Sequence, residues 1–144
     1  MPSISIRSTS KKFHFGTEDV HVSNPKSGWR CLVLEDEFLI ALDLQDILKG
    51  AGAAEVACFS NADEAMATLK DGGAFDFAVL DVSLGSASRT SLSVAAELAA
   101  RKTPFIFLTG MRPDPAHTSG HDAPVLEKPY QQTELLTAIR KILA

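Results

Sequence analysis

Short apolar runs alternate along the chain with segments whose apolar residues recur every three or four positions. The runs predict five β-strands, at residues 30–34, 54–59, 75–81, 104–110 and 124–128. The helical spacing predicts four helices, at residues 37–50, 60–70, 91–102 and 131–144. Strands that alternate with helices indicate an α/β fold built on a parallel sheet.

The local signals refine this pattern. Residues 75–81 and 104–110 are nearly continuous apolar runs, as expected for strands covered by helices on both faces. Ser60 or Asn61 can cap the second helix, and Gly50 with Gly52 can end the first. Residues 111–123 hold two prolines and lack a helical period, so we expect a fourth crossover helix that is short, distorted or absent.

The first 28 residues differ from the rest of the chain. They are polar and rich in serine and lysine, and they end in "SNPKSG", which is typical of a linker. We interpret residues 1–28 as an N-terminal extension and residues 29–144 as one domain. A disordered tail is the favoured interpretation. A short hairpin is the alternative, because "FHF" and "VHV" alternate apolar and polar positions around "GTED".

Composition excludes several classes of protein. The 144 residues suit one domain, and the net charge of −4 argues against a nucleic-acid-binding surface. The chain has neither an apolar run long enough to cross a bilayer nor a signal peptide, so we expect a cytoplasmic protein without membrane contact. Cys31 and Cys58 lie in apolar runs, and we expect both to be buried structural thiols.

Polar residues stand where four of the predicted strands end. Glu35 and Asp36 follow the first strand, Asp81 ends the third, Thr109 ends the fourth and Lys128 ends the fifth. In open parallel sheets the functional crevice lies beyond the carboxyl ends of the strands. We therefore expect these five side chains to share one site.

Their chemistry is specific. Three neighbouring carboxylates cannot all stay ionised without a counter-charge, and hard oxygen ligands of this kind suit Mg²⁺. A carboxylate can act as nucleophile toward a phosphoryl group and form an aspartyl phosphate. An ammonium group would offset charge on the transferring oxygens, and a hydroxyl would bind the phosphoryl group after transfer.

Residues 29–144 resemble the response-regulator receiver domain of two-component signalling. The resemblance rests on "EDE" at 35–37, "VLDVSLG" at 79–85, "FLTG" at 107–110 and "EKPY" at 127–130, in this order and spacing. It implies a flavodoxin-like, doubly wound (βα)5 fold, with the five strands in the order 2-1-3-4-5.

The resemblance also implies the roles of the acidic residues. Asp81 would be the phosphoacceptor. Asp36, Asp81 and the backbone carbonyl of Ser83 would bind Mg²⁺ directly, and Glu35 would act mainly through bound water. We expect Glu37 to begin the first helix instead, because the helix dipole favours a negative charge there.

Thr109 would be the switch hydroxyl and Lys128 the phosphate-sensing ammonium. The chain departs from the family pattern at Val125, where an aromatic switch residue is usual. "PFIFLTGMR" is similar to the F-A-T-G-x-Y subgroup of alphaproteobacterial single-domain regulators, although Leu108 replaces its alanine and Arg112 its tyrosine.

The function implied is that of a stand-alone receiver. It would take a phosphoryl group from a histidine kinase or a histidine phosphotransfer protein and signal through protein contacts. It would not be an enzyme beyond a self-catalysed, Mg²⁺-dependent phosphotransfer. A receiver-like interaction module that works without phosphorylation is the alternative, and Val125 favours it. A flavodoxin-like cofactor binder or a phosphohydrolase is a third hypothesis; Ser83 offers no acid to protonate a leaving group, which argues against the hydrolase.

Overall fold

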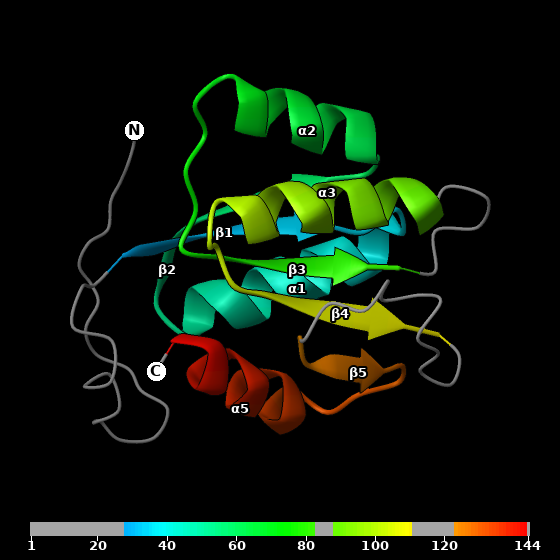
Figure 1. The fold of residues 1–144 in the computed structure, drawn as a ribbon. Helices are drawn as coiled ribbons and strands as arrows, with labels where there is room; N and C mark the ends of the chain where they lie inside the picture. The colour runs from blue at the N-terminus through cyan, green and yellow to red at the C-terminus, as the bar shows by residue number, and fades with distance from the viewer. Residues whose placement is uncertain (1–27, 83–87, 111–122, 144) are drawn as a thin grey trace.

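The computed structural model describes residues 28–82, 88–110 and 123–143 (Figure 1). Five parallel strands form one sheet in the order β2-β1-β3-β4-β5, which confirms the predicted fold and strand order. The strands are β1 (Trp29–Leu34), β2 (Ala53–Phe59), β3 (Phe77–Asp81), β4 (Phe105–Thr109) and β5 (Val125–Glu127).

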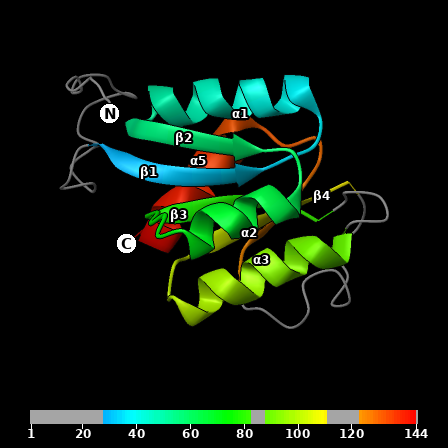
Figure 2. The same ribbon diagram turned by 90° about the horizontal axis from the view of Figure 1, so that it is seen from above.

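Helices cover both faces of the sheet. They are α1 (Phe38–Gly50), α2 (Ala62–Lys70), α3 (Ser88–Ala100) and α5 (Gln132–Leu143). One apolar core joins α1 and α5 to the sheet, and a second core joins α2 and α3 to its other face (Figure 2). Every residue of β3 and β4 is buried, as their continuous apolar sequences predicted. The predicted irregular fourth helix and most of the N-terminal extension lie outside the described residues.

Capping signals set the helix boundaries. Asn61 is the N-cap of α2, and its side chain accepts a hydrogen bond of 2.9 Å from the backbone N–H of Glu64. Glu37 is the N-cap of α1, without a side-chain capping bond. After α1 the chain turns at Gly52, whose φ of 122° is a conformation that L side chains rarely adopt. None of the described helices is long and apolar enough to span a membrane.

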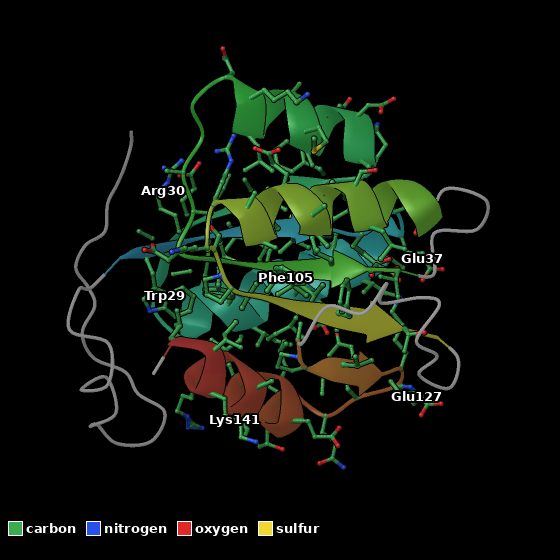
Figure 3. All side chains as sticks on the ribbon, in the orientation of Figure 1. Trp29, Arg30, Glu37, Phe105, Glu127 and Lys141 are labelled. Atoms are coloured by element: carbon green, nitrogen blue, oxygen red, sulfur yellow. The ribbon has the colours of Figure 1, made fainter. Side chains whose placement is uncertain are left out.

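Two arginines fasten the amino end of the sheet. Arg30 donates to the Glu55 carboxylate and to the Ala74 carbonyl, each at 2.6 Å, and its guanidinium lies over the Phe75 ring. Arg101 donates to the carbonyls of Leu69 and Gly73, and so ties the end of α3 to the last turn of α2 and to the α2–β3 connection. Figure 3 shows Arg30 at the opposite end of the sheet from Glu37. The amino end is thus held by hydrogen bonds between side chains and backbone.

One prediction about the core was wrong. Cys31 is buried as expected, but Cys58 is exposed, and neither forms a disulfide. Cys58 lies on β2, which is one of the two edge strands of the sheet. An edge strand is flanked by another strand on one side only, so an apolar sequence does not ensure that each of its side chains is covered.

Candidate functional site

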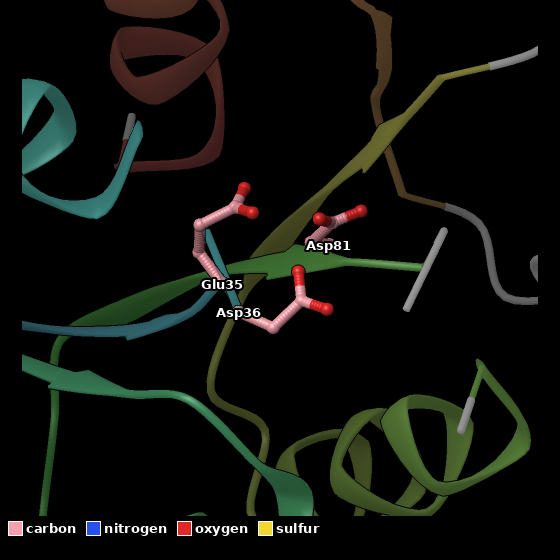
Figure 4. Close-up of side chains that lie close together, drawn as sticks. All are labelled: Glu35, Asp36 and Asp81. Atoms are coloured by element: carbon pink, nitrogen blue, oxygen red, sulfur yellow. The ribbon is translucent and has the colours of Figure 1, made fainter. Parts of the chain in front are cut away.

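Three carboxylates meet where β1 and β3 end. Glu35 and Asp36 directly follow β1, and Asp81 is the last residue of β3. Because β1 and β3 are neighbouring parallel strands, with Leu34 beside Leu80, their carboxyl ends lie at the same edge of the sheet. One oxygen atom from each carboxylate lies within 4.8 Å of those of the other two (Figure 4). The structure thus brings the three acids together.

The three acids differ in exposure. Glu35 is 2% exposed and Asp81 is 1% exposed, whereas Asp36 is open to solvent. Burial removes the hydration that stabilises a carboxylate, and a second buried carboxylate adds repulsion. The cluster therefore has an inner pair that resists joint ionisation and one acid at the surface.

Lys128 supplies the counter-charge. Its Nζ lies 3.0 Å from Asp81 Oδ2 and 3.2 Å from Glu35 Oε1, so that one ammonium bridges both buried carboxylates. Its backbone N–H donates to the Thr109 carbonyl at 2.8 Å, which fixes the chain after β5 against the end of β4. Burial lowers the pKa of Lys128, but its hydrogen bond to Asp81 and the charges of both carboxylates outweigh this and raise the pKa overall.

Glu35 has a pKa close to neutrality. Burial is the main cause, and the charge of Asp81 adds to it, raising the pKa of Glu35 to about 7. The backbone N–H of Glu37 donates to Glu35 Oε2 at 3.1 Å and, with Lys128, limits the rise. Near pH 7 the site therefore changes charge with small changes in its surroundings.

The remaining predicted residues surround this cluster or lie outside the described chain. Thr109 is 2% exposed and ends β4, next to β3 at the same edge of the sheet. Val125 is half-buried at the start of β5, opposite Phe107 of β4. Ser83 lies outside the described residues.

An exposed apolar surface beside the site was missed by the sequence reasoning. Phe38 is 74% exposed, Leu39 76% and Leu42 41%, all on the first turns of α1 directly after the acids. A signal was present, because residues 38–42 add apolar positions outside the single buried face that helical spacing defines. We call Phe38, Leu39 and Leu42 the α1 patch.

The donor set determines what the site can bind. Two buried carboxylates share one ammonium, and the exposed Asp36 carboxylate lies beside them. This arrangement leaves negative charge that a cation would offset, and the ligands offered are hard oxygens. The residues present therefore fit a divalent cation such as Mg²⁺.

Comparison with known proteins places the chain among signalling domains. The family model for the response regulator receiver domain matches residues 31–140. Among curated proteins no match is found. Many solved structures match, and the similar ones include receiver proteins from bacteria.

Three of these structures are informative. A response regulator receiver protein from Sinorhizobium medicae WSM419 has 28% sequence identity and a TM-score of 0.70, covering 81% of this chain and 94% of that chain. SdrG from Sphingomonas melonis Fr1 has 35% identity and a TM-score of 0.67, covering 83% of this chain and 99% of that one. The BeF3-activated conformation of SdrG, attributed to Pseudomonas melonis Fr1, has 36% identity and a TM-score of 0.65, covering 80% and 96%.

Proposed function

The chain belongs to the response regulator receiver domain family, and we propose that it accepts a phosphoryl group on Asp81. The observation that carries this proposal is the Asp81 carboxylate itself, which is 1% exposed, adjoins two further acids and lies 3.0 Å from Lys128 Nζ. The donor would be a histidine kinase or a histidine phosphotransfer protein, in the cytoplasm. The chain would be a phosphoacceptor rather than an enzyme, with self-catalysed transfer at most.

In the proposed reaction a carboxylate oxygen of Asp81 attacks the phosphorus atom of a phosphohistidine. An O–P bond forms as the N–P bond breaks, and the imidazole leaves with the bonding electron pair and takes up a proton. The attacking carboxylate must be ionised, and the Lys128 ammonium favours that form. The same ammonium would offset negative charge on the transferring oxygens.

The acid cluster would hold Mg²⁺. We propose Asp36, Asp81 and the backbone carbonyl of Ser83 as direct ligands, with Glu35 acting through water. When bound, the ion would supply positive charge to the phosphoryl oxygens. Binding needs ionised carboxylates, so the pKa of about 7 at Glu35 would make metal affinity rise with pH and would couple binding to proton release.

The signal would arise at the same edge of the sheet. Thr109 ends the strand beside Asp81, and its hydroxyl would bind the phosphoryl group once it is attached. Lys128 would have to exchange its contact with the Asp81 carboxylate for one with the phosphoryl oxygens. Because Lys128 and Thr109 are joined through their backbones, movement of either would reach the chain after β5.

A protein donor would meet the α1 patch. The donor histidine must come within bonding distance of Asp81, and the patch starts immediately after Asp36 and Glu37. Exposed apolar side chains beside a reactive centre are typical of an interaction surface. We propose that the α1 patch packs against the histidine-bearing protein during transfer, whereas a small phosphodonor would not need it.

A receiver-like module that binds its partner without phosphorylation is the alternative function. The half-buried Val125 favours it, because the family usually has an aromatic switch residue there. Such a module would bind equally well with and without a phosphoryl mimic. The activated conformation described for SdrG, at 36% identity, instead supports a site that responds to such an anion.

The test is the intact mass of the full chain after incubation with phosphoramidate or acetyl phosphate, with and without Mg²⁺. Asp81→Asn tests the acceptor, and Asp46→Asn on the exposed side of α1 is the matched control. We expect one Mg²⁺-dependent phosphoryl adduct in the wild type and in Asp46→Asn, and none in Asp81→Asn. A wild type that never forms the adduct would shift the weight to the phosphorylation-independent module.

A further inference from the structure

A buried hydroxyl outside the acidic site is directed at its central residue. Among the described residues four polar or charged side chains are buried, and three of them are Glu35, Asp81 and Thr109. The fourth is Ser91 of α3, which is 0% exposed. Its Oγ donates a hydrogen bond of 3.0 Å to the backbone carbonyl of Asp81. This side chain therefore reaches the backbone of the acceptor rather than its carboxylate.

The surroundings of Ser91 are apolar. The next turn of α3 contributes Val94 and Ala95 to the same core as Leu80 and Val82 of the β3 region, and α3 packs beside β3 (Figure 1). A hydroxyl in such a core loses its water and must find a partner inside the protein. The Asp81 carbonyl provides that partner.

With this hydrogen bond, both polar atoms of the peptide group between Asp81 and Val82 have a partner. The carbonyl of Asp81 accepts from Ser91, and the N–H of the same peptide group, which belongs to Val82, donates to the Leu108 carbonyl of β4 at 2.9 Å. A helix on one side and a strand on the other therefore hold both polar atoms of the peptide group that follows the Asp81 Cα. Because peptide groups are planar, this sets the backbone angle ψ of Asp81 and the direction in which the chain leaves β3.

We propose that Ser91 is a positioning residue, which fixes the backbone of Asp81 so that its carboxylate is held in the geometry needed for metal binding and phosphoryl transfer. The expected effects of Ser91 on metal binding and on phosphorylation rest on the proposed function. Reactive groups must be held close to their productive geometry, and displacements of about 1 Å can slow a reaction by about a hundredfold. Ser91 acts through the Asp81 carbonyl and takes no part in the bond changes.

The experiment compares Ser91→Ala with Val94→Ala in the full chain. Val94 is also fully buried, one turn further along α3, so its truncation loosens the same helix without removing a hydrogen bond to Asp81. We measure three quantities: the carbonyl ¹³C shift of Asp81 in metal-free protein, the Mg²⁺ dissociation constant by calorimetry, and the rate of adduct formation with phosphoramidate. Ser91→Thr, which keeps the hydroxyl, tests rescue.

We expect Ser91→Ala to move the Asp81 carbonyl resonance, to weaken Mg²⁺ binding at least about threefold and to slow adduct formation at least about tenfold. Val94→Ala should leave the Asp81 carbonyl resonance in place and keep the Mg²⁺ dissociation constant and the adduct rate within about twofold of the wild type, even where it lowers the thermal midpoint as much as Ser91→Ala does. Ser91→Thr should restore the rate. Equal effects of Ser91→Ala and Val94→Ala, or an unchanged rate in Ser91→Ala, would overturn the proposal.

A second variant and two measurements that do not require phosphorylation also test the role of Ser91. If Ser91→Ala does not fold, Ser91→Cys replaces it, because a thiol has similar volume but is a much weaker donor. If the wild type itself forms no adduct, the proposed function fails. The carbonyl shift and the Mg²⁺ affinity then decide the role of Ser91 alone, and values for Ser91→Ala equal to those of the wild type would overturn it.

Discussion

The pKa of Glu35 makes a quantitative prediction about stability. In the folded protein burial raises this pKa to about 7, while the ordinary value of 4.5 applies to the unfolded chain. Between these two values the folded protein holds a proton that the unfolded chain has released. The free energy of unfolding must therefore fall as the pH rises through this window. The contribution of Glu35 is fully present below about pH 4.5 and is lost above about pH 7.

The size of the effect follows from the same difference. A separation from 4.5 to about 7 corresponds to roughly 3 kcal/mol, since one pH unit is worth about 1.4 kcal/mol. Small domains have a free energy of unfolding of about 5–15 kcal/mol, so this is a large share of the total. The Lys128 Nζ lies 3.2 Å from Glu35 Oε1 and lowers the pKa of Glu35, and the value of about 7 already includes this effect.

The assay is urea unfolding of metal-free protein between pH 5 and pH 8, comparing the wild type with Glu35→Gln. Trp29 is the only tryptophan in the chain and is 5% exposed, so its fluorescence reports global unfolding. Titrating groups outside the site are common to both proteins and cancel in the comparison, whereas Asp81 and Lys128 contact Glu35 and contribute to the measured difference. We expect the wild type to lose roughly 2–3 kcal/mol more than Glu35→Gln over this range. Parallel pH profiles would refute the reasoning.

The stabilisation by added Mg²⁺ should depend on pH in the opposite direction. The ion needs ionised carboxylates, so it should stabilise the wild type more at pH 8 than at pH 6. An ion that stabilised the protein equally at both values would show that Glu35 is not linked to the metal site.

Three further predictions concern Lys128, Gly73 and the α1 patch. Lys128→Ala should keep Mg²⁺ binding in calorimetry but abolish the phosphorylation-dependent change in partner affinity; an unchanged partner response would contradict its proposed sensing role. Gly73→Ala should lower the free energy of unfolding by about 1–3 kcal/mol in urea titrations, because its Cβ would lie 2.8 Å from the Thr68 carbonyl oxygen, whereas Gly50→Ala, with nothing within 4 Å, should not destabilise. Leu39→Ala should slow phosphoryl transfer from a phosphorylated histidine protein several-fold and leave the phosphoramidate rate unchanged; equal slowing with both donors would exclude a docking role for the α1 patch.

The fold and the grouping of the acids were predictable from the sequence for a physical reason. Parallel strands that are covered on both faces are continuous apolar runs, so a charge such as Asp81 at the end of a run marks the end of the strand. Strands of one parallel sheet end at one edge, which brings Glu35 and Asp81 together without any knowledge of the loops. Strand periodicity was therefore sufficient to place the acids at one edge of the sheet, whereas the resemblance to receiver domains implied that β1 and β3 are neighbours.

Other features depend on neighbours that a local pattern does not reveal. The exposure of Cys58 follows from the position of β2 at the sheet edge, which is a property of the strand order and not of its own sequence. The hydrogen bond from Ser91 crosses from a helix to a strand end ten residues earlier, and a serine in a helix has no local signature for such a contact. The pKa of Glu35 depends on burial and on Asp81, both of which require the folded chain.

The amino end of the sheet is held by paired charges and hydrogen bonds, whereas the carboxyl end carries the candidate site. At the amino end Arg30 and Arg101 each donate to a backbone carbonyl and to a carboxylate of opposite charge. At the carboxyl end two buried carboxylates share one ammonium, which costs folding energy in the absence of a cation. A fold tolerates such a cost only where the surrounding structure is over-determined, as the fully buried β3 and β4 make it here. We infer that above about pH 7 replacing Glu35 by Gln would give a more stable metal-free protein with a poorer cation site, because the charge of the ionised Glu35 causes both the instability and the affinity.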